Sequence, residues 1–315
     1  MLLFLVVVLH YNGLCAPTHT PSVGGCARQR FNEKTLEDVM KVHTVDGVWI
    51  DEFASLGEAL TYAKDNNKRE ACDTKSKDDW YGSPDLDTAV QMGFDGWQEI
   101  RPKVEAMFSR MEEQINMAIG DVFEMRYDYG GDSVDIDRFL MGDPECMLEY
   151  DVVPAGRMGR VVKVLVNGAA SCAVSAEAIQ QRGALAVALV DVLNKLGVGV
   201  EVWLESATEY ESKKHSQLIK LHSSEERLDV NNLMFAMAHP SMLRRVGFSI
   251  LEKTGWEPAR RCAKVGAGYG RPHDLTQAKR IEADVSIDRI QNATGDPVAD
   301  GVAYIMSTVK GLDLL

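Results

Sequence analysis

The sequence predicts an α/β domain over residues 158–315, with a mostly parallel sheet and helices on both faces, preceded by a helix-rich α+β region over residues 40–157. Three observations carry this prediction. Residues 160–166 form a nearly continuous apolar run, which is typical of a strand buried on both faces of a parallel sheet. An amphipathic helix follows, and residues 198–204 then alternate as a second strand does. Together these segments make one βαβ unit, whose crossover should be right-handed.

The helix of this unit has clear start and stop signals. Ser175 can cap its N-terminus, and Glu177 lies in the first turn, where a carboxylate favours the positive end of the helix dipole. Gly197 ends the helix. Its core face is predicted from residues at helical spacing: Leu185, Leu189, Val192 and Leu196.

The rest of the second half continues the alternation of strands and helices. Residues 217–221 predict a third, shorter strand, residues 230–244 a helix, and residues 284–290 another strand. Residues 246–251 fit either a fourth strand or more helix, because periodicity does not decide between them. Asp296 and Pro297 then begin a last helix, as N-cap and first helical residue.

The region 40–157 is predicted as a mixture of short elements. Ser55 and Glu58 have the spacing of a capping box at the start of a short helix, and the polar stretch 64–77 predicts a loop. Further helices are expected from Leu86 and over residues 101–118, and a strand over residues 122–129. Two segments predict short helices or turns: residues 134–140 and 144–147.

Residues 1–39 are expected to be an unstructured or spurious extension, with Met40 as the native start. The apolar run over residues 2–9 is too short to span a bilayer. No lysine or arginine precedes it, so the charged region of a secretory signal is missing. The alternative is a genuine signal peptide cleaved near Cys15, in which case the protein is secreted.

Composition narrows the classes of partner. The net charge is −13, from 47 acidic and 34 basic residues, and such a surface repels phosphate backbones. The composition therefore does not indicate a nucleic-acid partner, although it leaves open the alternative of a local basic patch. No membrane partner is expected. Six scattered cysteines without a Cys-x-x-Cys pair argue against a zinc ribbon and favour a reduced, cytoplasmic protein.

The order of elements in the second half resembles the Rossmann-like von Willebrand factor A domain, in which a short third strand lies antiparallel at the sheet edge. The resemblance implies a metal loop of the form Asp-x-Ser-x-Ser after the first strand. The corresponding residues here are Asn167, Gly168, Ala169, Ala170 and Ser171, and only Ser171 keeps the pattern. Because hard cations prefer charged oxygen ligands, no metal site is expected, and no cofactor is predicted.

The glycine-rich stretch 264–274 contains Tyr269, Arg271 and His273. Its glycine spacing does not match the dinucleotide-binding fingerprint, which favours an ordinary surface loop. No Gly-x-Ser-x-Gly or His-Glu-x-x-His motif occurs, so no catalytic residue is predicted.

Any ligand or partner is expected at the carboxyl edge of the sheet, where open α/β sheets bind ligands at the point of strand-order reversal. That point is predicted between the strand ending at Val166 and a strand ending near Leu251. The residues predicted to converge there are Asn167, Ser171, Tyr269, Arg271 and His273.

Five segments carry a second resemblance: residues 55–59, residues 80–84 (Trp-Tyr-Gly-Ser-Pro), residues 96–97 (Gly-Trp), residues 142–147 (Gly-Asp-Pro-Glu-Cys-Met) and residues 161–188. From about residue 50 onward the chain resembles an uncharacterised family encoded by bacteriophages and prophages. This resemblance implies synthesis in the host cytoplasm and no mechanism. We therefore expect a non-catalytic binding or assembly protein with protein partners. The alternative is an enzyme acting on a nucleotide or nucleic acid at the carboxyl edge of the sheet.

Overall fold

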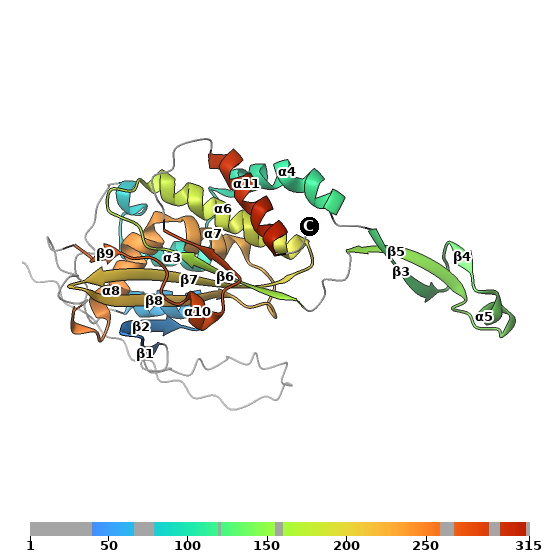
Figure 1. Cartoon of the computed structure of the whole chain (residues 1–315), viewed down its shortest axis with the longest axis horizontal. Coiled ribbons are helices and arrows are strands. Elements are labelled where there is room, and N and C mark those ends of the chain that lie inside the picture. The colour runs from blue at the N-terminus through green and yellow to red at the C-terminus, as the bar shows by residue number, and fades with distance from the viewer. Residues whose placement is uncertain are drawn as a thin grey trace, which may run out of the picture. The chain divides into compact units, whose positions relative to one another are not determined.

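The computed structural model of the chain describes residues 40–65, 79–118, 121–154, 160–258, 268–289 and 297–312 (Figure 1). The expected extension 1–39, most of the polar stretch 64–77, part of the glycine-rich stretch and Asp296 lie outside these residues. The elements in chain order are β1 (Lys41–Val45), β2 (Val48–Phe53), α2 (Leu56–Lys64), η2 (Asp79–Tyr81), α3 (Leu86–Asp95), α4 (Arg101–Ala118), β3 (Asp121–Asp128), β4 (Ser133–Val134), α5 (Ile136–Leu140), β5 (Met147–Pro154), β6 (Val161–Asn167), α6 (Ala176–Lys195), β7 (Gly199–Tyr210), β8 (Lys213–His222), α7 (Val230–Ala238), η3 (Met242–Gly247), α8 (Phe248–Lys253), β9 (Arg271–Pro272), α10 (Ala278–Ile281), β10 (Val285–Ile287) and α11 (Pro297–Gly311). No helix among the described residues is long and apolar enough to cross a membrane.

The central sheet has the strand order β1-β2-β8-β7-β6-β10 and is mostly parallel along this path. β6 runs parallel to both β7 and β10, with Val164 opposite Val202 and Val285, and β2 runs parallel to β8. The pairs β1–β2 and β7–β8 are antiparallel, and the short β9 pairs antiparallel with β7. The chain is thus a mixed α/β protein, and the predicted βαβ unit β6-α6-β7 is confirmed.

The two faces of the central sheet are covered differently. Because side chains alternate along a strand, Val162, Val164 and Val166 point to one face and Leu165 to the other. The valine face packs against most of the helices, and Figure 1 shows α4, α6 and α11 side by side over the sheet. The opposite face packs Leu165 against Ile281 of α10. We expected helices on both faces, but in the described part of the chain this second face carries only the short α10.

The predicted helix signals around α6 are confirmed. Ser175 Oγ accepts a hydrogen bond from the Ala178 N–H at 3.1 Å, and Gly197 follows the helix with a φ of +74°. On the side facing α7, a Cβ on Gly183 would lie only 2.2 Å from the Cβ of Ala238. A glycine here therefore allows α6 and α7 to approach closely over the sheet.

The third strand of the second half is longer than expected. β8 covers Lys213–His222 rather than residues 217–221, and a tight turn with Glu211 and Ser212 at positive φ joins it to β7. This hairpin makes β8 antiparallel to β7, as the resemblance to the von Willebrand factor A domain implied. However, β8 is not an edge strand, because β2 pairs with its other side.

Residues 246–251 are helical and do not form a strand. Pro240 interrupts the helix expected over 230–244, and the π-helical turn η3 and then α8 follow. Val246, Ile250 and Leu251 are all buried there, which a helix tolerates because its backbone hydrogen bonds are internal. The prediction of a sheet edge between Val166 and a strand near Leu251 was therefore wrong, and the neighbour of β6 on that side is β10.

The N-terminal elements join the same sheet and core as the second half. The sequence pattern of residues 41–53 was not recognised as a hairpin, yet β2 pairs with β8 over its whole length. The boundary expected between residues 157 and 158 therefore does not divide the central sheet. In the same region, β3 and α5 occur where a strand and a short helix were expected, and β5 was missed. A second, antiparallel sheet has the order β3-β5-β4.

Candidate functional site

The carboxyl end of β6, where the sequence predicted a site, brings Asn167 and His273 together. Asn167 is buried, and its Nδ2 donates a hydrogen bond to the His273 carbonyl oxygen at 2.9 Å. Its Oδ1 accepts one from the Ala169 N–H, also at 2.9 Å. Both ends of this amide are thus occupied by the protein's own backbone.

Arg182 of α6 closes the crevice beside Asn167. Its guanidinium donates to the carbonyl oxygen of Asp288, at 3.1 Å, and to that of Asn167. Desolvation lowers the pKa of Arg182 to about 10, so the group is still charged at neutral pH. The space left there is about 10 Å³, room for about one water molecule. The residues at this point therefore fit neither a larger ligand nor a metal cation.

Of the other predicted residues, Arg271 and the nearby Tyr269 lie farther along β7, whereas Ser171 follows β6. Tyr269 stacks on Phe248 with ring centroids 3.8 Å apart, and its hydroxyl donates to Glu252 Oε1 at 2.6 Å. Arg271 lies in β9 and lines a separate hollow of about 430 Å³ together with Glu209. Ser171 Oγ accepts a local hydrogen bond from the Ala173 N–H. Among the described residues, no three or more histidine, cysteine or acidic side chains are grouped so that they could hold a metal ion.

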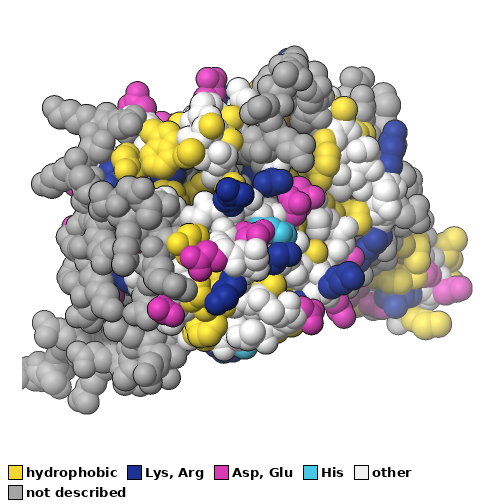
Figure 2. Space-filling view, turned by 60° about the vertical axis from the view of Figure 1, so that its left-hand side comes forward, with side chains coloured by type: hydrophobic (Ala, Val, Ile, Leu, Met, Phe, Trp, Pro, Cys, Tyr) yellow, Lys and Arg dark blue, Asp and Glu magenta, His cyan; other side chains and the backbone are white. Residues whose placement is uncertain are grey.

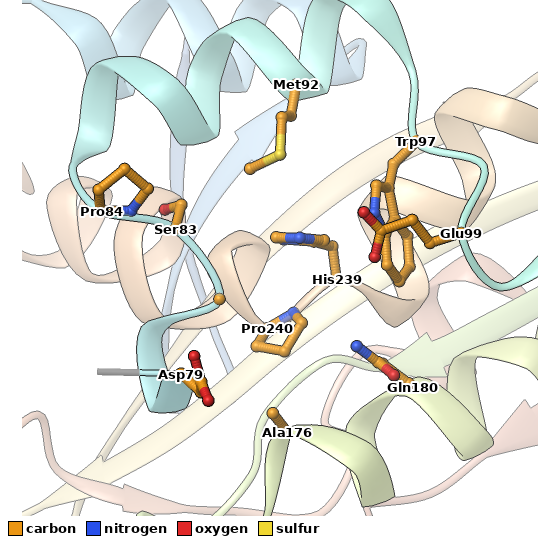
Figure 3. Close-up of a pocket in the computed structure, with 11 residues that line it drawn as sticks. Asp79, Ser83, Pro84, Met92, Trp97, Glu99, Ala176, Gln180, His239 and Pro240 are labelled. Atoms are coloured by element: carbon orange, nitrogen blue, oxygen red, sulfur yellow. The ribbon is translucent and has the colours of Figure 1, made fainter. Parts of the chain in front are cut away.

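Another pocket, of about 410 Å³, lies where the loop 79–84 meets α3, α6 and the end of α7 (Figure 3). Its lining includes Met92 of α3 and these polar and aromatic side chains: Asp79, Ser83, Trp97, Glu99, Gln180 and His239. Figure 3 shows the side chains of Trp97, Gln180 and His239 around one space, with the carboxylates of Asp79 and Glu99 at its border. We refer to this space as the loop 79–84 pocket.

Donors from the segment after α7 fix the loop 79–84. Arg244 donates to the Trp80 carbonyl oxygen at 2.6 Å, and Arg245 donates to that of Ser83 at 3.1 Å. Both arginines are almost completely buried, and each guanidinium carbon lies 4.0 Å from an aromatic ring centroid, Trp80 for Arg244 and Tyr81 for Arg245. The loop is therefore held in one conformation before any ligand binds.

Gly82 lets this loop close onto the end of α7. Its φ is +74°, a left-handed conformation that favours glycine. A Cβ at this position would lie 3.1 Å from Pro240 Cβ and 3.2 Å from His239 Cε1. The glycine thus serves both the backbone conformation and the close contact with His239 and Pro240.

His239 is buried between aromatic rings at the floor of the pocket. Its ring meets Trp97 edge-on at 4.6 Å and stacks on Phe235 at 5.3 Å between centroids. Desolvation lowers the pKa of His239 to about 4, so the ring is neutral at physiological pH. Its Nδ1 accepts a hydrogen bond from the Ser241 N–H at 3.2 Å, which assigns the proton to Nε2.

The serine hydroxyls near His239 are hydrogen-bonded to backbone carbonyl oxygens. Ser83 Oγ donates to the Asp85 carbonyl oxygen and Ser241 Oγ to that of Tyr81. Neither hydroxyl is hydrogen-bonded to His239, and within the described ranges no other serine, threonine or cysteine is. Instead, two exposed carboxylates and an indole ring border the pocket, and no lysine or arginine lines it. That set suits a cationic group.

The segments that form this pocket are far apart in the sequence, and no sequence pattern predicted that they meet. Trp80 to Pro84 and Gly96–Trp97 carry only the family resemblance in the sequence, and no site was predicted at His239. A signal existed in the His-Pro pair that ends the apolar helix α7, because a histidine in such a run is expected to be buried and neutral. The contact between that pair and Gly82 is long-range and follows only from the fold.

The model of one protein family, described as Domain of unknown function (DUF7192), matches residues 32–314. Comparisons with curated proteins and with solved structures find no match. The matched range contains the central sheet, the sheet β3-β5-β4 and the loop 79–84 pocket. The expectation of an uncharacterised family is thereby confirmed.

Proposed function

Since the chain belongs to this family of unknown function, its activity must be inferred from its own geometry, and we propose that it is a non-catalytic binding or assembly protein. In this proposal the loop 79–84 pocket takes a lysine or arginine side chain of a protein partner. The observation that carries it is a pocket of about 410 Å³ bordered by Asp79, Glu99 and Trp97 and lined by no basic residue.

The physical chemistry of the pocket favours a cation in three ways. Carboxylates form charge-assisted hydrogen bonds with ammonium and guanidinium groups, and a desolvated cation on an indole ring gains about 2 kcal/mol. The neutral His239 adds no repulsive charge. The loop held by Arg244 and Arg245 is already ordered, so binding loses little conformational entropy there.

The finer description of the scaffold is part of the same proposal. Strands β8, β7, β6 and β10 keep the order of a von Willebrand A-like, Rossmann-like sheet with β8 antiparallel. The extension by β1 and β2 and the helical segment η3–α8 depart from that pattern. The full engagement of Asn167 and the position of Arg182 support the inference of a scaffold without a working metal loop. A phage origin and a place in the host cytoplasm or virion rest on the sequence resemblance alone.

The alternative function, an enzyme acting on a nucleotide or nucleic acid, needs an anion-binding surface. Arg271 lines a hollow large enough for a phosphate, but Glu209 and Glu211 line it as well. Figure 2 shows basic and acidic side chains mixed on the face that it presents, without a continuous basic patch among the described residues. These charges favour the binding protein over the enzyme.

The test is a titration of the full chain with short glycine peptides that carry one central arginine, lysine or glutamate, and with adenosine triphosphate, followed by calorimetry and tryptophan fluorescence. We expect the arginine and lysine peptides to bind with a dissociation constant on the order of 1 mM, as befits a single side chain. The double variant Asp79→Asn/Glu99→Gln should weaken this binding about tenfold, while Glu225→Gln, an exposed carboxylate outside the pocket, should not. Tighter binding of adenosine triphosphate that survives the double variant would support the enzyme instead.

A further inference from the structure

The short helix α5 and the residue after it expose apolar side chains to an unusual degree. Ile136, Phe139, Leu140 and Met141 are between 63 and 83% exposed. The first three lie at positions i, i+3 and i+4, so they share one face of the helix. Single exposed apolar residues are ordinary on protein surfaces, but a contiguous group of large ones marks an interaction surface. We refer to these four residues as the α5 patch.

Polar side chains attach α5 to the sheet β3-β5-β4 and leave its apolar face outward. Asp135 caps the helix by accepting from the Arg138 N–H at 3.1 Å, and it also accepts from the Tyr127 hydroxyl at 3.0 Å. The Arg138 guanidinium carbon lies 3.6 Å from the Tyr127 ring centroid, and its Nη1 lies 3.5 Å from Asp143 Oδ2. An ordinary surface helix buries its apolar face, so α5 is oriented the opposite way. This attachment holds the α5 patch in place.

Acidic residues surround the α5 patch. Residues 121–154 contain ten aspartates and glutamates against two arginines, Arg126 and Arg138. Arg126 pairs with Glu149 at 2.7 Å, and Arg138 lies close to Asp143. Asp132, Asp137 and Glu145 are also exposed, and each lies within four residues of the α5 patch along the chain. The surface is therefore apolar at its centre and negative at its border.

This charge selects among the occupants that could cover the patch. An anionic membrane surface would be repelled by the acidic border. A second copy of the chain would bring the same negative border against itself, and like charges facing each other are unfavourable. A partner segment with an apolar stripe bordered by lysine or arginine is complementary in both respects.

We propose that the α5 patch is a docking surface for an amphipathic basic helix of a partner protein. Ile136, Phe139 and Leu140 provide the apolar contact, and the acidic border provides orientation and a fast, salt-dependent association. This surface goes beyond the loop 79–84 pocket and does not depend on it, so either proposal can fail while the other stands.

The probe is a fluorescently labelled amphipathic peptide of leucine and lysine, titrated into the full chain and followed by anisotropy. We expect saturable binding that weakens about tenfold in Phe139→Ser/Leu140→Ser and that weakens as salt screens the acidic border. Phe94→Ser is the matched control, because Phe94 is also an exposed phenylalanine, 51% exposed, but lies on α3. Asp137→Asn/Glu145→Gln should weaken binding at low salt more than at high salt.

Three outcomes would overturn the proposal. One is peptide binding that is absent, or that is unchanged in the double serine variant, because the contact would then not involve the patch. Another is self-association of the unaltered chain in sedimentation velocity that the double serine variant abolishes, because the occupant would then be a second copy. The third is flotation with phosphatidylserine vesicles that depends on Phe139 and Leu140. Loss of peptide binding in Asp79→Asn/Glu99→Gln, with the serine variant unaffected, would assign the peptide to the pocket.

Discussion

The central sheet and the sheet β3-β5-β4 each contain a close contact between a basic and an acidic side chain, and the two contacts are of nearly equal length. In the central sheet, His215 Nε2 lies 2.8 Å from Asp51 Oδ2, and both side chains are completely buried. In the other sheet, Arg126 Nη2 lies 2.7 Å from Glu149 Oε2, and the two side chains are 59 and 40% exposed. Water screens the second pair and cannot reach the first. The distance between the paired atoms therefore does not determine how much such a contact contributes to stability. The exposure of the two side chains to water determines it.

The first prediction concerns removal of the buried contact between Asp51 and His215. Asp51→Ala should lower the free energy of unfolding by about 2–5 kcal/mol, because it leaves the buried His215 without its hydrogen-bond partner, and an unmade buried hydrogen bond is costly. It also removes the acceptor of the Trp49 Nε1–H, which lies 2.9 Å from Asp51 Oδ1. The measurement is urea denaturation at neutral pH.

Glu149→Ala is the matched control and should cost no more than about 1 kcal/mol, the usual worth of an exposed pair. Equal losses in the two variants would contradict the role given to burial. Asp51→Asn separates the effect of the charge from that of the hydrogen bond, because the asparagine keeps an oxygen acceptor but lacks the charge.

The second prediction concerns pH and the buried ring of His239. The pKa of His239 is lowered from 6.5 to about 4 in the folded protein. As pH falls below 6.5, the unfolded chain binds a proton that the folded chain does not, so stability falls between pH 6.5 and pH 4. The contribution is about 3 kcal/mol at most and is constant above pH 6.5.

The check is the free energy of unfolding from neutral pH down to about pH 4.5 in the unaltered chain and in His239→Gln. The variant should show a shallower loss on acidification. Burial also lowers the pKa of His222, so His222→Gln is the control and should remove a different part of the slope. An identical slope in His239→Gln and the unaltered chain would mean that His239 is not the group that titrates.

Local signals in the sequence predicted the parts of the fold that depend on neighbours in the chain. The helix signals Ser175 and Gly197 and the valine run of β6 depend only on residues nearby in the chain. The elements that they predicted were confirmed. Residues 246–251 had no such local signal. Their burial against the buried Arg244 and Arg245 is a property of the assembled core, and periodicity alone could not choose helix over strand.

The candidate site was harder to predict for the same reason. The sequence predicted a site at the carboxyl edge of β6. The fold does bring two of the predicted residues together there, since Asn167 donates a hydrogen bond to the His273 carbonyl oxygen. It did not reveal that Arg182, from the middle of α6, fills that edge. The loop 79–84 pocket joins Gly82 to His239 across about half the length of the chain, and no spacing rule spans such a separation.

The third prediction compares two glycines with nearly the same backbone conformation. Gly82 has a φ of +74° and close neighbours, whereas Gly142, in the turn after α5, has a φ of +76° and open space where a Cβ would lie, with no atom within 4 Å. Gly142→Ala should therefore cost about 1–2 kcal/mol of unfolding free energy from the backbone alone. Gly82→Ala should cost more, because its Cβ presses on His239 and Pro240, and it should also weaken binding of the arginine peptide. Equal costs would show that the loop can shift away from α7.

The last prediction has the smallest expected effect on stability and tests whether the α5 patch is a free surface. Phe139→Ser/Leu140→Ser should change the free energy of unfolding by no more than about 0.5 kcal/mol, because both side chains are exposed and lose no packing. Phe235→Ser, which removes a completely buried phenylalanine of the central core, should cost about 3–5 kcal/mol in the same denaturation experiment. The contrast separates apolar residues that stabilise the fold from apolar residues available to a partner. A loss near 2 kcal/mol in the double serine variant would mean that the α5 patch packs within the chain, and its role as a docking surface would then be lost.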